Sequence, residues 1–234
     1  MTRAGGGRHP LDNPAWPALT THHARFAEGV GPARRYVAGT SFFAAVDGLD
    51  DAAWSALASL TGIDGIAVLA RTTELDPPPP WEVVDVKPGH QLVASDLRPP
   101  NGPQPTVVVL GPEDGAAMVA LARLTKPGPF FERTPELGTF RGVFEGGRLV
   151  AMAGERLRLP GHVEVSGVCT HPDARGRGLA AALTHAVAGA AFDRGDTPFL
   201  HVAEGNEVAL RVYQRLGFVE RTTISFTVLR LTAG

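Results

Sequence analysis

The stretch that decides the fold is residues 163–180, VEVSGVCTHPDARGRGLA, in which an apolar run leads through a short loop into an Ala- and Leu-rich run. Valines and polar residues alternate over 162–169, which predicts a β-strand. The pattern over 178–192 predicts a helix that begins at or near Gly178. The loop between them holds two arginines and two glycines, Arg175, Gly176, Arg177 and Gly178.

This loop has the chemistry of an anion-binding site. The first turn of a helix leaves backbone N–H groups without intrahelical partners and carries the positive end of the helix dipole. Glycines let an anion come close to those N–H groups, and the two arginines add positive charge. The segment therefore predicts a cradle for a pyrophosphate.

A second segment lies C-terminal to this predicted helix and has the spacing Asn206-x-x-Ala209-x-x-x-Tyr213-x-x-x-Gly217-Phe218. Together with it, the pattern Arg175-x-x-Gly178-x-Ala180 resembles the acyl-CoA signature of the GCN5-related N-acetyltransferase (GNAT) superfamily. The resemblance covers residues 105–234, and within the superfamily this half is most similar to the FR47-like group.

The resemblance implies an α/β (α+β) fold with a mixed, mostly antiparallel sheet flanked by helices. The Pro-, Gly- and Asn-rich run at residues 96–105 is the best candidate boundary, because its composition resists both helix and strand. We expect an N-terminal α/β region at 1–103 and an acetyltransferase domain at 104–234. The first region is a degenerate copy of the fold, a lid or a dimerisation surface, and the sequence leaves these alternatives open.

In the N-terminal region, the run from Trp81 to Val86 predicts a strand, and Pro88-Gly89 follows it. We therefore expect this strand to end before Pro88.

The resemblance also implies acetyl-CoA as co-substrate, with its pantetheine arm in a gap between the strand at 163–169 and the strand at 199–202. The residues expected to hold it are Val168, Cys169, Thr170, Arg175, Gly176, Arg177, Gly178, Leu179, Ala180, Asn206, Ala209 and Tyr213.

Two residues are the candidates for catalysis. Tyr213 matches the tyrosine that the family points at the thioester sulfur, and its phenol can donate a proton to the leaving thiolate. Glu164 matches the glutamate that the histone-acetylating branch uses as a base, and His201 is its rival. Strand alternation places Glu164, Ser166 and Val168 on one face.

Cys169 precedes the loop and invites the interpretation of a nucleophile, but no His/Asn or His/Asp arrangement supports it, so we expect a core residue. The acceptor site is predicted at residues 125–137. Its aromatic side chains enclose an apolar group or fill the seam with the N-terminal region, and its arginine could hold a carboxylate. The candidates for this site are Phe130, Phe131, Arg133 and His201.

Composition excludes several other classes. The net charge of −2 gives no reason to expect nucleic-acid binding, and one cysteine among 234 residues excludes an internal disulfide. The eight histidines are not clustered like ligands, so no metal is implied. No apolar run is long enough to span a membrane, and residues 1–10 lack the apolar segment of a signal peptide, so we expect a cytoplasmic protein without membrane contact.

The sequence therefore predicts an enzyme that transfers an acetyl group from acetyl-CoA to a primary amine, a small molecule or a peptide. A homodimer stays an open alternative. Two rival functions remain. A non-catalytic acyl-CoA-binding protein would keep the cradle without turnover. A dinucleotide-binding enzyme would use Gly176-x-Gly178-x-x-Ala181, but that pattern should follow its strand directly and needs more strand–helix units than remain.

Overall fold

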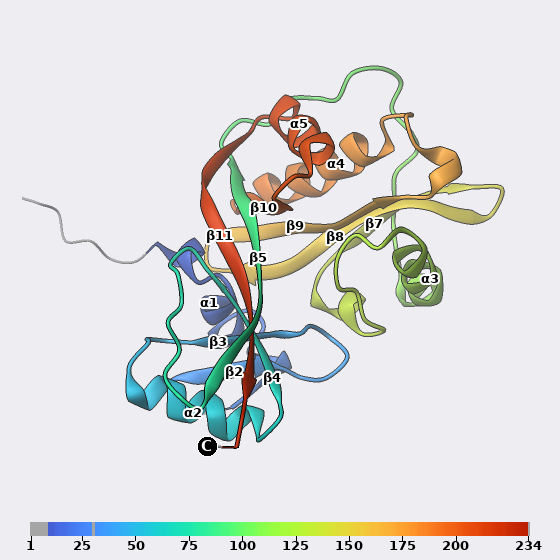
Figure 1. The fold of residues 1–234 in the computed structure, drawn as a ribbon. Coiled ribbons are helices and arrows are strands. Elements are labelled where there is room, and N and C mark those ends of the chain that lie inside the picture. Colours follow the sequence, from blue (N-terminus) through green and yellow to red (C-terminus); the bar gives the residue numbers. More distant parts are fainter. Residues whose placement is uncertain (1–8, 30, 234) are drawn as a thin grey trace, which may run out of the picture.

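The computed structural model of the chain describes residues 9–29 and 31–233, and within them one 11-stranded sheet carries both halves of the sequence. Its strand order is β1-β2-β3-β4-β11-β5-β10-β9-β8-β7-β6 (Figure 1). The strands are β1 Ala27–Glu28, β2 Ala33–Tyr36, β3 Phe43–Val46, β4 Ile66–Arg71, β5 Trp81–Ala94, β6 Val108–Val109, β7 Phe140–Glu145, β8 Arg148–Leu159, β9 His162–Thr170, β10 Thr197–Ala203 and β11 Phe218–Leu231. The helices are α1 Ala15–Thr20, α2 Asp51–Thr61, α3 Gly115–Thr125, α4 Leu179–Asp193 and α5 Glu207–Arg215.

The expected fold class is confirmed. Apart from β3–β4 and β9–β10, every strand pair in the described sheet is antiparallel. The helices α4 and α5 cover one face of the C-terminal half, and α3 lies against β8 and β9 on the other (Figure 1).

The two halves of the chain repeat one order of connections. In the N-terminal half, α2 joins the parallel strands β3 and β4, and in the C-terminal half α4 joins the parallel strands β9 and β10. A long antiparallel strand follows each unit along the chain, β5 after β4 and β11 after the segment of α5. The repeated order of connections is what a degenerate copy of the fold predicts, and that interpretation of the N-terminal half stays a prediction.

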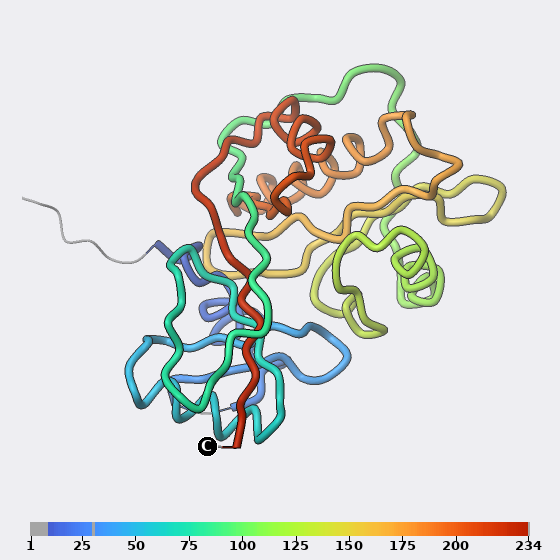
Figure 2. Tube along the Cα trace, in the orientation of Figure 1, coloured from blue at the N-terminus to red at the C-terminus, as the bar shows by residue number. Residues whose placement is uncertain are grey.

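The two long strands are exchanged between the halves. β11 pairs with β4, and β5 pairs with β10, while β5 and β11 pair with each other over most of their length. Figure 2 shows the two traces crossing at the middle of the molecule. The sheet of residues 104–234 therefore includes β5, a strand from the other side of the expected boundary, and the division at residue 103 stays a prediction.

The prediction that the strand ends before Pro88-Gly89 is wrong, because β5 continues to Ala94. Pro88 lies just before the residues at which β10 joins β5, and β10 pairs with Gly89 through Val93. A Cβ at Gly89 would lie 2.6 Å from the carbonyl oxygen of Val202, so only glycine allows the two strands to approach this closely.

Helix α4 forms and packs for reasons that the sequence carries. Alanine and leucine dominate it, and both favour helix. Its buried residues include Leu183, Val187 and Ala188, which pack with Val150, Val165 and Leu200 in the core of the C-terminal half. Small alanines let the helix axis lie close to the sheet, and this packing fixes the position of its first turn.

Candidate active site

Strands β9 and β10 are paired at their start and then diverge, and the gap between them forms the site. They pair only from His162–Glu164 against Thr197–Phe199. Beyond that point β9 stays with β8, and β10 stays with β5. The splayed gap that the family resemblance implied is therefore present.

A β-bulge in β9 changes which side chains face this gap. Between the pairs Met152↔Cys169 and Gly154↔Ser166, two residues of β9 lie opposite one of β8, and Gly167 has a φ of 62°. A bulge shifts the alternation by one residue. The expectation that Val168 shares a face with Glu164 is therefore wrong, and Val168 packs instead on the α4 side.

A cavity of about 750 Å³ fills the gap between β9, the start of α4 and α5. All of the predicted cofactor residues except Arg177 line it. Besides close sequence neighbours of the predicted residues, the cavity has lining residues that were not predicted to hold the cofactor. They lie in the connection between the halves and at the start of the predicted acceptor loop: Pro99, Pro100, Asn101, Thr125, Lys126 and Pro127. No local pattern marks these residues, because only the tertiary fold brings them to the cavity.

The loop before α4 has the geometry of an anion cradle. Gly176 and Gly178 have φ values of 76° and 77°, and a Cβ built at either position meets nothing within 4 Å. Gly178 precedes α4 and gives it no side-chain cap, so the N–H groups of the first turn are open to the cavity. This open, positively polarised backbone fits the pyrophosphate of CoA.

The two arginines of the loop differ. Arg175 lines the cavity, and its Nε donates to the Thr170 carbonyl over 3.3 Å. Arg177 lies outside the cavity and forms two hydrogen bonds with Glu145, the last residue of β7, at 3.0 and 2.5 Å. Its side chain therefore ties the loop to the hairpin.

Helix α5 places Asn206 and Tyr213 on the cavity. The Asn206 side chain caps the helix by accepting from the Ala209 N–H over 3.2 Å. Burial raises the pKa of Tyr213 to about 12, so its phenol keeps its proton at neutral pH. Among the described residues its hydroxyl has no hydrogen-bond partner, which leaves it free to donate into the cavity.

Cys169 does not have the setting of a nucleophile. Its side chain is buried among Met118, Leu121 and Met152. Burial raises the pKa of its thiol to about 11, so it is a neutral thiol at physiological pH.

Glu164 lies in the interior, with none of its surface exposed. Both of its oxygens accept from Arg156, at 2.8 and 3.0 Å, and one also accepts from His201 Nδ1 at 2.8 Å. Burial alone would raise the pKa of Glu164, but the charge of Arg156 and the hydrogen bond from His201 lower it to about 2. Such a carboxylate is a weak base, and this geometry does not favour direct proton abstraction by it.

The partners of His201 fix its tautomer. The Gln91 amide oxygen accepts from Arg221 at 2.6 Å, so the amide nitrogen is the group that lies 3.1 Å from His201 Nε2. An amide nitrogen only donates, and the imidazole Nε2 must therefore accept. With Nδ1–H directed at Glu164 and Nε2 accepting from Gln91, both ring nitrogens of His201 are engaged in hydrogen bonds.

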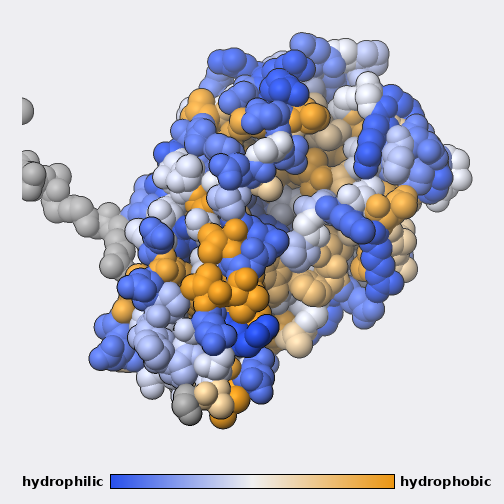
Figure 3. Space-filling model, viewed as in Figure 1, coloured by the Kyte–Doolittle hydropathy of each residue, from blue (hydrophilic) through white to orange (hydrophobic). Residues whose placement is uncertain are grey.

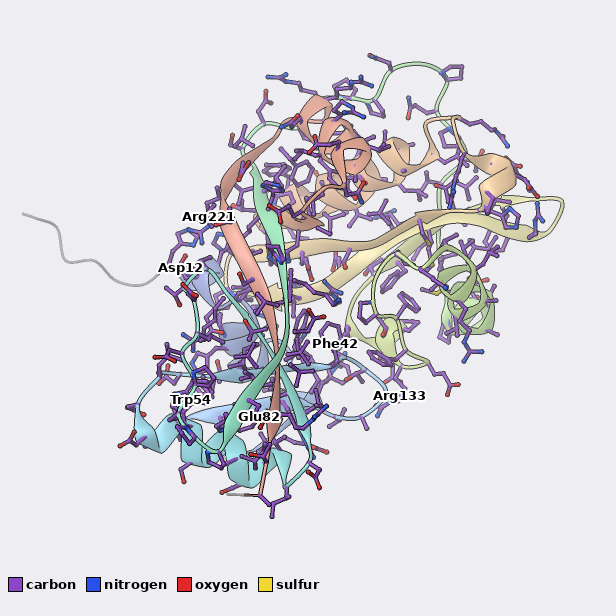
Figure 4. The ribbon with its side chains drawn as sticks, viewed as in Figure 1. Asp12, Phe42, Trp54, Glu82, Arg133 and Arg221 are labelled. Carbon is purple, nitrogen blue, oxygen red and sulfur yellow. The ribbon has the colours of Figure 1, made fainter. Side chains whose placement is uncertain are left out.

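The hydrogen bonds of Glu164 and His201 continue, through Gln91, across the seam between the N-terminal and C-terminal halves. Arg221 on β11 forms an ion pair with Asp12, and the two labelled side chains face each other in Figure 4. Asp12, Arg221, Gln91, His201, Glu164 and Arg156 thus form one chain of hydrogen bonds. We call it the seam network.

The two phenylalanines predicted for the acceptor site lie in different places. Phe130 packs edge-on against Phe140, with ring centroids 5.5 Å apart, and lines a small second cavity together with Ser166 and Arg156. Phe131 contacts Phe42 of the N-terminal half at 6.4 Å between ring centroids. Phe131 therefore lies in the seam.

Arg133 is held by contacts within the protein, which does not favour its predicted role in binding a ligand carboxylate. It forms a two-pronged ion pair with Glu136, at 2.8 and 2.9 Å, and its backbone N–H donates to the Gly39 carbonyl. Figure 4 shows Arg133 beside the loop of the N-terminal half that carries Phe42.

The fold, the splayed strands and the open cradle together describe the class of proteins that bind an acyl-CoA between two strands of a mixed sheet. The profile of the FR47-like protein family matches residues 140–227. A GNAT-family protein from Novosphingobium aromaticivorans DSM 12444 is 38% identical, covers 97% of this chain and 100% of its own, and superposes with a TM-score of 0.86. The chain belongs to the GNAT acetyltransferase family.

Two more distant structures share the fold. A GCN5-related N-acetyltransferase from Kribbella flavida is 23% identical over 93% of this chain and 94% of its own, with a TM-score of 0.63. A GCN5-related N-acetyltransferase-like protein from Streptococcus suis 89/1591 is 15% identical over 94% and 95%, with a TM-score of 0.54. None of the curated proteins compared with the chain matches it.

In the part of the chain that the structure describes, no helix has the length and apolar character needed to cross a membrane.

Proposed function

We propose that the protein transfers the acetyl group of acetyl-CoA to a primary amine by direct attack of the amine on the thioester. The observation that carries this proposal is a single cavity with an uncapped helix start at one end and the buried Tyr213 phenol on its wall. Acetyl-CoA supplies the activated acyl group when it is bound.

The chain's own residues have three roles in this proposal. The N–H groups from Arg175 to Ala180 hold the pyrophosphate, and the unpaired edge of β9 at Val168–Thr170 holds the pantetheine through main-chain groups. Tyr213 donates its proton to the departing thiolate, for which its raised pKa keeps it protonated. Asn206 keeps α5, and with it Tyr213, in place through its cap.

In this proposal, water takes the proton of the amine. Glu164 and His201 are both engaged in the seam network, and neither has a free lone pair suited to the task. The acceptor enters from the Phe130 side of β9, where a second small cavity lies beside Ser166 and Gly167. A small amine or a peptide N-terminus fits this approach, and the acceptor's own pKa would then govern the rise of rate with pH.

The test is the Tyr213→Phe variant, which removes the proton and little else. Release of free thiol from acetyl-CoA is measured with a panel of amines, and CoA binding is measured by calorimetry. We expect turnover to fall about 100-fold while CoA binding is unchanged. Wild-type protein that binds acetyl-CoA but releases no thiol with any amine would favour the alternative, a non-catalytic acyl-CoA-binding protein.

A further inference from the structure

The connection between the halves, residues 95–107, contacts the C-terminal half near both of its ends, while most of its residues are exposed. We call it the linker. Leu97 and Val107 pack against the core beside α4, and the Arg98 N–H donates to the Leu216 carbonyl over 2.9 Å. A Cβ at Gly217 would lie 2.0 Å from the Asp96 carbonyl oxygen, so the chain segments touch directly.

The middle of the linker is stabilised by hydrogen bonds between its own residues. The Gln104 side chain donates to the carbonyls of Pro100 and Gly102, at 3.1 and 2.8 Å. Proline at positions 99, 100, 103 and 105 limits the backbone further. Sequence composition predicts a boundary here, which stays a prediction, and in the structure the segment is a strap held by its own hydrogen bonds.

This strap forms one wall of the cofactor cavity. Pro99, Pro100 and Asn101 line it together with Leu179, Ala180 and Ala181 of the first turn of α4. The linker starts beside Gly189, in the second half of α4, and passes over α5 and α4 toward the cradle (Figures 1 and 2). Its middle, residues 99–101, therefore lines the same cavity as the loop before α4.

The chemistry of this wall suits a nucleoside. Two adjacent prolines offer flat, apolar and already rigid surfaces, and an asparagine amide both donates and accepts hydrogen bonds, as the edge of a purine does. Arg215 lines the same cavity and has no ion-pair partner among the described residues, so a positive charge is available for a phosphate.

We propose that Pro99, Pro100 and Asn101 bind the adenosine part of CoA, so that the connection between the halves is itself part of the cofactor site. This inference rests on the proposed function, because it presupposes that the cavity holds CoA. It adds a binding element that lies outside the residues 140–227 matched by the family profile.

The experiment compares two ligands on three proteins by calorimetry. The ligands are CoA and 4′-phosphopantetheine, which lacks the adenosine. The proteins are the wild type, the triple variant Pro99→Gly/Pro100→Gly/Asn101→Ala, and the matched control Pro103→Gly/Pro105→Gly, which loosens the same linker at positions outside the cavity lining. Melting curves check that each protein is folded, and Asn101→Ala alone serves if the triple variant is not.

We expect the triple variant to lose about tenfold in affinity for CoA and nothing for 4′-phosphopantetheine, while the control binds both ligands as the wild type does. An equal loss for both ligands, or unchanged CoA affinity, overturns the proposal. Wild-type protein that binds neither ligand overturns the proposed function itself and this inference with it, and that outcome is distinct from the other two.

Discussion

The two strand–helix–strand units of the chain differ most at the point where the helix begins. In the N-terminal unit, the Asp50 carboxylate caps α2 by accepting from the Ala53 N–H over 2.9 Å. In the C-terminal unit, Gly178 precedes α4 and supplies no side-chain cap. The first helix is neutralised by its own anion, and the second is left open for one that comes from outside.

The charged residues near the start of each helix differ in the same sense. The turn before α2 carries Asp47, Asp50 and Asp51, which repel phosphate, whereas the loop before α4 carries Arg175 and Arg177. Trp54 of α2, labelled in Figure 4, lies in the core of the N-terminal half. Its ring packs on that of Trp81, with ring centroids 6.2 Å apart. One unit serves as framework and the other as site.

The largest expected effect comes from separating the two units. Residues 104–234 alone should fail to form a stable fold, because β5 is missing between β10 and β11. Circular dichroism and a melting curve measure this, and co-expression with residues 1–103 should restore a cooperative transition. A fragment 104–234 that melts cooperatively and keeps full activity would contradict the dependence of one half on the other.

The next effect concerns Glu164, which ties the site to the seam between the units. Glu164→Gln should cost about 3–5 kcal/mol of unfolding free energy, because it leaves the Arg156 charge buried without its partner. The matched control is Glu145→Gln, which breaks the exposed pair with Arg177 and should cost under about 1 kcal/mol. Urea unfolding measures both, and equal costs would show that the seam network does not hold the halves.

Gly178→Asp tests the comparison directly, because it gives α4 the kind of carboxylate cap that α2 has. We expect affinity for CoA to fall about 100-fold, since the carboxylate occupies the N–H groups and repels the pyrophosphate. Gly178→Asn is the control, with the same size and the same positive φ but no charge. If both variants lose CoA equally, backbone strain and not charge is responsible.

The smallest effect is a pH dependence of stability in the N-terminal half. Burial lowers the pKa of His23 from 6.5 to about 4, and its Nδ1 lies 2.7 Å from the Tyr36 hydroxyl. The unfolded chain therefore takes up a proton more readily than the folded one, and stability that is complete above pH 6.5 falls as the pH drops toward 4. We expect a loss of about 2 kcal/mol between pH 7.5 and pH 5.

His23→Gln should flatten that slope, because glutamine does not titrate in this range. Urea unfolding at the two pH values measures the difference. A slope that is unchanged in the variant would assign the acid sensitivity to other groups.

Parts of the fold that rest on local signals could be predicted from the sequence. The strand β9 and the helix α4 lie close to where the sequence predicts them, at residues 162–169 and 178–192. Their apolar periodicity and their glycine turns are encoded within a few residues. The cofactor residues were expected for the same reason, because the loop at 175–178 and the helix at 206–213 are contiguous.

Features that depend on distant partners could not be predicted. The continuation of β5 past Pro88 depends on β10 and β11, which lie more than a hundred residues away. The bulge at Gly167 reversed an alternation that the sequence alone made regular. The setting of Glu164 depends on Arg156, His201 and Gln91, and no spacing in the sequence brings those three together.

Strand exchange also sets the order in which the protein can be completed during synthesis. β4 of the N-terminal half has β11 as its neighbour in the sheet, and β11, Phe218–Leu231, lies about 150 residues further along the chain. The first half therefore cannot finish its sheet until β11 has left the ribosome. Its contacts are far apart in sequence, which predicts slow folding and a late, concerted closure of both halves.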